Sequence, residues 1–322
     1  MRQVSLAHFA VALALTACSP AKQPSPGTEL AWAYPHAKEG PLPEVPPGLH
    51  RIPGSTRVYT GAQLNDEKVA PDWNPEEHPP EPDIVARERP GGPTPCAECH
   101  LMNGQGFLAI PNLAGLPASY IVQQVQEFRS GRRRSWEAGR PATQEMIEVS
   151  QKVTDQELAS AAAYFSRLPL RRWYRVVETD QVPATKPDYY GWLDLVPGGG
   201  SEPIGGRIIE VAEDFPRMTM EDPRSGVVVY VPRGAIARGE ALVRTGGVGG
   251  LACASCHGAA LKGVGDIPPL AGRSAAYLAR MLWDMKTGAR QGPAVAQMQP
   301  IAGALSEADI TNIAAYLASQ KP

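Results

Sequence analysis

Four of the five cysteines in this 322-residue chain form two similar motifs. Residues 96–100 read CAECH and residues 253–257 read CASCH, so each motif has two thiols separated by two residues and an imidazole directly after the second thiol. Such a pair of thiols can bind a metal, form a redox-active disulfide or attach haem covalently. The candidate functional residues of the two motifs are therefore Cys96, Cys99, His100, Cys253, Cys256 and His257.

The motifs belong to a longer internal repeat. An offset of 157 residues carries the first motif onto the second, and the Ile-Pro pair at 110–111 onto the Ile-Pro pair at 267–268, without a gap. The offset then falls by five residues, and Met146 matches Met298. Self-similarity at a fixed offset indicates that the chain contains two copies of one small domain.

We predict that copy 1 (residues 91–170) and copy 2 (residues 236–322) are bundles of short helices. Apolar residues recur at helical spacing across residues 118–128, and Gly131 follows as a suitable C-terminal cap. Ser306 precedes a second apolar helical pattern and has the residue type of an N-cap. The predicted fold class is mainly α, with two tandem domains of short helices.

The connector between the copies, residues 171–235, has a different character. Its two runs RIIEV (207–211) and VVVYV (227–231) are rich in β-branched residues, which favour strands. We therefore expect a small β-hairpin that bridges the two domains. Met218 and Met220 alternate between the runs, and we expect them to pack on a strand face.

Residues 18–90 are predicted to form a tether and a surface-hugging arm. Of the 33 prolines, 17 lie between Pro20 and Pro95, where helical periodicity is absent. Proline fixes φ and removes a hydrogen-bond donor, so a regular packed domain is not expected here. Trp73 and Ile84 are the residues of the arm that we expect to dock on a folded neighbour.

The N-terminus has the pattern of an export signal. Arg2 precedes an apolar stretch that ends at Ala17, too short to span a bilayer and typical of a signal-peptide core, so residues 1–17 are predicted to be removed. The sequence LTAC resembles a bacterial lipobox, which implies lipidation of Cys18. We therefore expect a lipoprotein anchored to a membrane in the periplasm, and Ser19 favours the outer membrane.

The charge balance gives no sign of a nucleic-acid partner. The chain has 31 basic and 33 acidic residues, so no strong positive field is expected. The run Arg132, Arg133 and Arg134 is its one notable basic cluster, and we expect it to be a solvated helix end.

Covalent haem attachment is the chemistry that the repeated motif favours. Zinc needs four ligands at local spacing, whereas each copy offers two cysteines and one histidine. A thioredoxin-like site needs a βαβ context, and the predicted flanks are helical. A structural disulfide between Cys96 and Cys99 is the remaining alternative. In the C-x-x-C-H motif the thiols can bond to the two vinyl groups of a haem while the histidine reaches the iron, so two haem c groups are expected.

A low-spin haem iron needs a sixth ligand, and methionine in that position raises the reduction potential. Met102 follows His100 too closely to reach the opposite face of the ring, and Met281 and Met285 fall on an apolar helical pattern typical of a core. We therefore predict that Met146 and Met298, one per copy and both expected in loops, are the distal ligands.

Both copies resemble class I cytochrome c domains, and the tandem resembles the dihaem cytochrome c4 type. The resemblance rests on CAECH, IPNLAG and VTDQELASAAAYF in copy 1, and on CASCH, IPPLAG and MQPIAGALSEADITNIAAYL in copy 2. It implies that the carbonyls of Pro111 and Pro268 accept a hydrogen bond from the second ring nitrogen of each histidine. The arm and the long connector depart from that family pattern.

With both axial positions filled by the protein, the expected function is outer-sphere transfer of single electrons in a respiratory chain. The expected partners are a redox protein donor and an acceptor, such as a dehydrogenase or an oxidase. The alternatives are a dihaem enzyme of the peroxidase or thiosulfate-oxidising type, and a cytochrome subunit of a larger complex.

Overall fold

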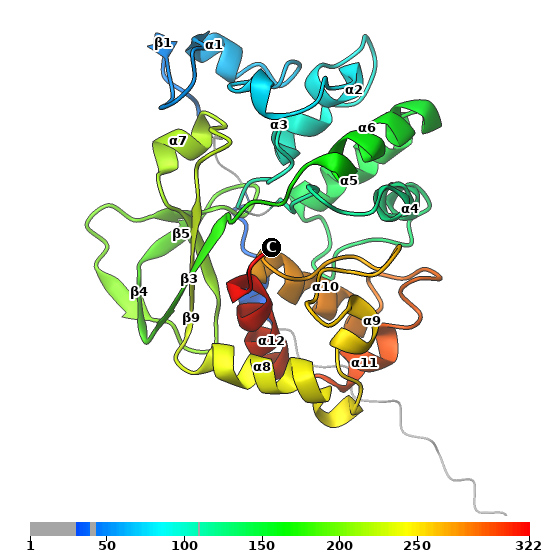
Figure 1. The fold of residues 1–322 in the computed structure, drawn as a ribbon. Helices are drawn as coiled ribbons and strands as arrows, with labels where there is room; N and C mark the ends of the chain where they lie inside the picture. The colour runs from blue at the N-terminus through cyan, green and yellow to red at the C-terminus, as the bar shows by residue number, and fades with distance from the viewer. Residues whose placement is uncertain (1–29, 39–42, 109) are drawn as a thin grey trace, which may run out of the picture.

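The computed structural model describes residues 30–38, 43–108 and 110–322. The predicted signal peptide and Cys18 lie outside this range. Within it, the helices of copy 1 and copy 2 lie one above the other, and the strands of the connector run along one side (Figure 1). None of the helices in the described part of the chain combines the length and hydropathy that a membrane span requires.

Copy 1 is a helical bundle in which the first helix carries the CAECH motif. Thr154 caps the last helix through a reciprocal pair of hydrogen bonds with Glu157, which stabilises the start of that helix. Ile121, Leu158 and Phe165 pack in the buried cluster at the centre of the bundle. The helices are α3 (Cys96–His100), α4 (Ala118–Arg129), α5 (Pro141–Lys152) and α6 (Asp155–Arg167).

Copy 2 repeats this arrangement and adds a helix at its start. Ser306 caps the last helix with the same reciprocal hydrogen bonds, here to Asp309. The added helix crosses the last one closely, because a Cβ atom at Gly239 would overlap the carbonyl oxygen of Asn312. The helices are α8 (Ala235–Thr245), η3 (Gly247–Gly249), α9 (Ala254–His257), α10 (Ala275–Thr287), α11 (Gln299–Ala304) and α12 (Glu307–Ser319).

The connector forms a three-stranded sheet with the order β3-β9-β8. As expected, the two β-branched runs pair antiparallel, as β8 (Ile209–Ala212) and β9 (Val227–Pro232). They do not form a tight hairpin, because α7 (Phe215–Thr219) lies between them, and β3 (Tyr174–Thr179) pairs parallel with β9 on the other side. Two small antiparallel pairs complete the connector: β4 (Gln181–Pro183) with β7 (Ser201–Pro203), and β5 (Thr185–Pro187) with β6 (Leu193–Leu195).

The prediction for the connector methionines was wrong. Met218 lies inside α7, where it is fully buried, and Met220 is the C-cap of that helix. Asp214 caps the start of α7 by accepting a hydrogen bond from the Arg217 N–H. A capped single turn of helix therefore replaces the strand that the alternating methionines suggested.

The proline-rich arm packs against the rest of the molecule through short elements. Trp73 is buried, and its indole Nε1 donates a 2.7 Å hydrogen bond to the Met220 carbonyl of the connector. Ile84 packs in the buried cluster of copy 1, so both residues dock as predicted. The elements are η1 (Ala31–Ala33), β1 (Leu49–His50), β2 (Tyr59–Thr60), α1 (Gly61–Leu64), η2 (Pro75–Glu77) and α2 (Asp83–Ala86).

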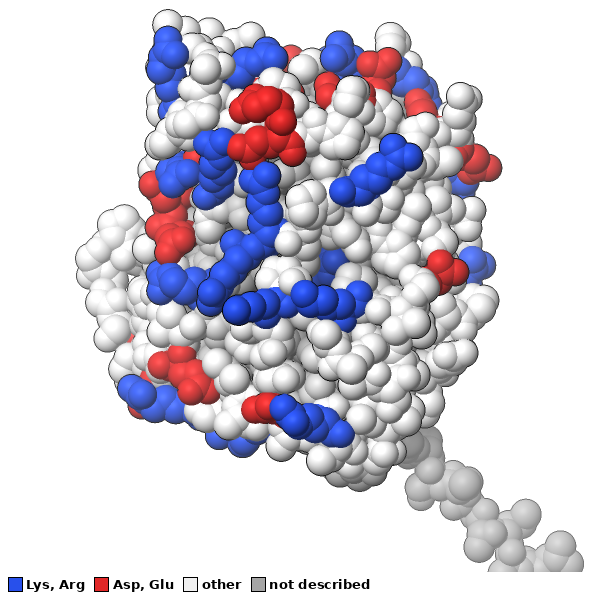
Figure 2. All heavy atoms as spheres, viewed as in Figure 1, with Lys and Arg blue, Asp and Glu red and all other residues white. Residues whose placement is uncertain are grey.

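The start of the arm packs on copy 2. The Tyr34 hydroxyl donates a 2.7 Å hydrogen bond to Asp284 on α10, and the Arg280 guanidinium donates to the Ala33 carbonyl. The arm therefore contacts both copies. Acidic and basic side chains are intermixed on the face seen in Figure 2, around broad uncharged areas.

Candidate functional site

The two repeated motifs form short helices that present their residues in the same way. Cys96 and Cys99 are three residues apart on α3, a spacing that places both thiols on one side of a helical turn. His100 ends α3 and is buried. In copy 2, Cys253 is the N-cap of α9 and His257 is its last residue.

Each histidine is oriented by a backbone carbonyl eleven residues further along the chain. His100 Nδ1 lies 2.9 Å from the Pro111 oxygen, and His257 Nδ1 lies 2.9 Å from the Pro268 oxygen. Because a carbonyl only accepts, each Nδ1 carries the proton and each Nε2 has a free lone pair. Burial lowers the pKa of His100 to about 4 and also lowers the pKa of His257. Both rings are therefore neutral at neutral pH, the form that binds a metal.

Burial has the opposite effect on the thiols, because it disfavours the thiolate. It raises the pKa of Cys96 to about 12, and it raises the pKa of Cys99 well above the usual value. The pKa of Cys253 is raised for the same reason. The nucleophilic cysteine of a thioredoxin-like site instead has a lowered pKa.

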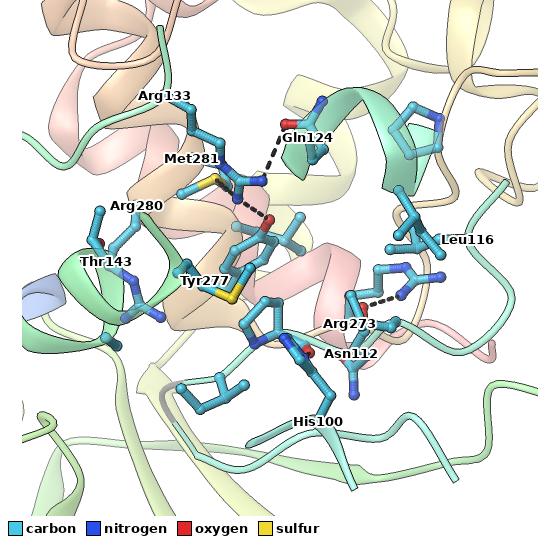
Figure 3. Close-up of a pocket in the computed structure, with 18 of the residues that line it drawn as sticks. His100, Asn112, Leu116, Gln124, Arg133, Thr143, Arg273, Tyr277, Arg280 and Met281 are labelled. Carbon is cyan, nitrogen blue, oxygen red and sulfur yellow. Dashed lines mark hydrogen bonds between the residues drawn. The ribbon is translucent and has the colours of Figure 1, made fainter. Parts of the chain in front are cut away.

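One cavity of about 930 Å³ is shared by both copies. Its walls are largely apolar, and the polar side chains of Gln124, Arg133 and Tyr277 lie where the copies meet (Figure 3). The cavity brings together all the residues that the sequence predicted to bind a cofactor or its metal: Cys96, Cys99, His100, Met146, Cys253, Cys256, His257 and Met298.

The two predicted distal methionines differ in their local structure. Met146 lies in the middle of α5, so the expectation of a loop was wrong. Helix α5 begins at Pro141, whose fixed φ suits a first helical position, and it continues through Met146 to Lys152. Met298 is the N-cap of α11, at the end of a loop as expected. Both methionines are half-buried and line the cavity.

The family model for cytochrome c matches residues 94–169 and 236–321, which together make up just over half of the chain. The chain belongs to the cytochrome c family. Each match covers one copy of the repeat, so the protein has two tandem cytochrome c domains and binds two covalently attached haem c groups.

Other proteins are similar to most of this chain. The thiosulfate dehydrogenase electron acceptor of Stutzerimonas stutzeri is 27% identical over 237 residues, which is 71% of this chain and 82% of that protein. Cytochrome c4 of Pseudomonas aeruginosa is 26% identical over 228 residues, which is 69% of this chain and 82% of that protein. The crystal structure of reduced cytochrome c4 from Pseudomonas stutzeri is 24% identical, with a TM-score of 0.43 over 70% of this chain and 93% of that one. The protein is a dihaem cytochrome of the electron-transfer class.

The cavity has the chemistry that a haem requires. A haem is an apolar ring with two carboxylates, and the apolar walls suit the ring. The cavity is also lined by Arg140, which is 4% exposed and whose Nε and Nη2 have no partner among the described residues. Arg290 Nε is unpartnered in the same way. Buried N–H donors without an acceptor are costly, so these unpartnered groups suit the carboxylates of the cofactor.

The burial of charged residues in the cavity wall was not predicted from the sequence. The run at 132–134 was expected to be a solvated helix end, but Arg133 is only 7% exposed and lines the cavity. The tertiary contact between the copies buries it, and a single basic run does not reveal such a contact. The repeat offset was the available signal, because it carries Arg133 onto Arg290, which is 3% exposed.

Proposed function

We propose that this dihaem cytochrome is an exported carrier that passes single electrons between two redox proteins of a respiratory chain. The observation that supports this most directly is the shared cavity, which both thiol-thiol-histidine motifs line together with one predicted methionine from each copy. Haem iron supplies one-electron chemistry by alternating between the ferric and ferrous states.

The residues of each copy have distinct proposed roles. Cys96 and Cys99 attach one haem and Cys253 and Cys256 the other. The proposed iron ligands are His100 with Met146 in copy 1, and His257 with Met298 in copy 2.

The proposed supporting residues are the two prolines whose carbonyls accept the histidine protons. The bond from His100 Nδ1 to the Pro111 oxygen fixes the ring, keeps Nε2 free for iron and makes it a stronger donor. Pro268 does the same for His257. A thioether as the second ligand favours the reduced iron and raises the potential.

A carrier is favoured over an enzyme because two protein ligands leave the iron no open position for a substrate. Among the relatives, the Stutzerimonas protein is named as an electron acceptor of thiosulfate dehydrogenase, so a dehydrogenase is the proposed donor. An oxidase is the proposed acceptor. We also propose that lipidation of Cys18 holds the protein at a bacterial membrane, with the outer membrane favoured, and that the domains lie in the periplasm.

The test uses the full chain, expressed in a bacterium that matures c-type cytochromes. We expect the protein in washed membranes, with the added mass of two haems. The oxidised form should show the absorption band of a methionine-to-iron bond for both haems, and carbon monoxide should leave the reduced spectrum unchanged. Bound carbon monoxide together with turnover of thiosulfate or peroxide would support the enzyme instead. A mass without haem would exclude both functions.

A further inference from the structure

The connector loop that joins β5 to β6, residues 188–192, reaches the wall of the haem cavity. Asp188, Tyr190 and Trp192 all line the cavity. The Trp192 ring packs on the ring of Phe107, a buried residue of copy 1, at 5.1 Å between centroids. The connector loop therefore lies against the first haem-binding domain.

The proline-rich arm holds the connector loop from the other side. The Asp188 carbonyl accepts a 2.7 Å hydrogen bond from the Ala37 N–H of the arm, and the Asp188 carboxylate accepts one of the same length from the Trp192 N–H. At Gly191 the backbone has a φ of 89°, and a Cβ atom there would overlap the Pro35 carbonyl oxygen. These contacts fix the conformation of the connector loop independently of copy 1.

One side chain of the connector loop binds the helix that carries a proposed iron ligand. The Tyr190 hydroxyl donates a 2.8 Å hydrogen bond to Glu145 Oε2, and Glu145 directly precedes Met146 on α5. All three residues line the cavity. Burial, followed by the Glu145 carboxylate, raises the pKa of Tyr190, so the hydroxyl stays protonated and keeps its donor role in alkaline solution. Movement of Met146 away from the iron would strain or break this bond.

Copy 2 is different at the equivalent position. The offset of 152 residues that relates Met146 to Met298 also relates Glu145 to Gln297. Glu145 is half-buried, whereas Gln297 is exposed and forms no hydrogen bond with the connector in the described ranges. The connector loop therefore distinguishes the two haem sites, although their motifs and predicted ligands are the same.

The chemistry of the proposed ligand gives this contact a consequence. A thioether binds ferric iron more weakly than an imidazole does, so the methionine bond depends on how firmly the protein holds its segment. We propose that Tyr190 is a positioning residue for Met146, and that the connector loop is a lid that keeps this ligand on the first haem and excludes external ligands from its iron. This inference rests on the proposed function, because it requires Met146 as the ligand in copy 1.

The test measures how readily imidazole displaces each methionine from ferric iron in the matured, full-length protein. Tyr190→Phe keeps the ring and removes only the hydroxyl. We expect the haem of copy 1 to bind imidazole roughly tenfold more tightly in this variant, the size of change that loss of one hydrogen bond causes. The affinity of the haem of copy 2 should stay the same. Proton NMR resolves the ligated methionine methyl group of each haem, and the signal that Met298→His removes belongs to copy 2.

The matched control is Tyr189→Phe, which makes the same chemical change at the adjacent position. The Tyr189 side chain is 38% exposed, so loss of its hydroxyl should leave both imidazole affinities at their starting values. An effect in this control as large as that of Tyr190→Phe would contradict a specific role of the bond to Glu145.

Variants of the acceptor test the same bond from its other end. Glu145→Gln keeps an oxygen that can accept from Tyr190, so it should preserve most of the resistance to imidazole. Glu145→Ala removes the acceptor and should match Tyr190→Phe. Because both changes break one bond, the double variant Tyr190→Phe, Glu145→Ala should bind imidazole no more tightly than either single variant. Additive effects would contradict the positioning role.

The outcomes separate this inference from the proposed function. If the unaltered protein shows both methionine signals, and Tyr190→Phe changes both haems or neither, the lid is wrong and the carrier function stands. If the unaltered protein shows no methionine signal for the haem of copy 1, the proposed ligand set fails together with the lid.

Discussion

At the scale of single residues, the histidine and the methionine of each copy are positioned by different segments of the chain. The histidine is held by a 2.9 Å hydrogen bond to a proline carbonyl, so its position is set by a loop of the same copy. The methionine comes from a separate helical segment, α5 in copy 1 and the start of α11 in copy 2. The two proposed ligands therefore depend on different parts of the fold and can be altered independently.

We predict that Met298→His lowers one midpoint potential and leaves the other nearly unchanged. Imidazole favours ferric iron relative to a thioether, and axial ligands tune haem potentials over roughly 0.8 V, so the shift should be a sizeable part of that range. Potentiometry with haem-resolved spectra measures it. Met285→Leu is the matched control, since Met285 also lines the cavity. Loss of a methionine band in this control would reassign the ligand in copy 2.

The sequence predicted cavity residues well where the chemistry is local. The motif, the repeat offset and the proline carbonyls all lie within short stretches of chain. The helical position of Met146 was missed, although Ala142, Met146 and Val149 recur at helical spacing along α5. The sequence also did not reveal that Arg133 is buried, because its partners Tyr277 and Gln124 become neighbours only when the copies meet.

At the scale of elements, the arm behaves as part of the folded molecule although its helices and strands are short. Trp73 packs on Tyr59 inside the arm, at 4.7 Å between ring centroids, and it anchors the arm through its bond to the connector. Arg89 continues the attachment with an ion pair to Glu157 on α6. The arm needs few backbone hydrogen bonds to keep its conformation, since proline already restricts the backbone in the unfolded chain.

We predict that Trp73→Ala destabilises the packing of the arm by roughly 3–5 kcal/mol, the usual cost of removing a large buried aromatic side chain. Trp73→Phe keeps most of the ring and loses the indole hydrogen bond, so it should cost about 1 kcal/mol. Limited proteolysis with mass spectrometry should show faster cleavage within residues 43–90 for the alanine variant. Equal cleavage rates in all three proteins would contradict an anchoring role.

The helix starts could be predicted because residues next to each other in the sequence mark them, whereas the missed strand pairing has no such marker. The capping residues Ser306 and Thr154 each precede an acidic residue at the third helical position, a pattern visible in the sequence. Strand β3 pairs parallel with β9, and its register joins Tyr174 to Val227 across the whole connector. A pairing over such a separation depends on how the intervening chain folds.

At the scale of the whole molecule, the two copies are related by sequence but differ in their surroundings. Cys256 is exposed, whereas Cys99 is half-buried. Glu221 of the connector lies close enough to Cys99 to affect its pKa, and Tyr190 of the connector donates a hydrogen bond to Glu145 of copy 1. The connector therefore covers the motif of copy 1 on a side where the motif of copy 2 is open.

We predict that the double variant Cys253→Ala, Cys256→Ala matures with one haem and a loosened copy 2. Without the attached ring, the apolar walls of its half of the cavity lose their packing partner, so α10 should be destabilised. The N-terminal segment that binds Asp284 should then be released. Mass spectrometry measures haem content, and hydrogen exchange of residues 30–38 and 275–287 measures the loosening. Unchanged exchange in both segments would contradict this coupling.

The contact between Tyr34 and α10 also constrains when the protein can finish folding. The two ends of the Tyr34–Asp284 bond are 250 residues apart, so a segment made early stays unpartnered until most of the chain has been synthesised. Contacts of such long range close slowly. A ribosome adds about 5–20 residues per second, so synthesis of the intervening residues alone takes on the order of tens of seconds. Until the exported chain closes this contact, the N-terminal segment is accessible to chaperones and proteases.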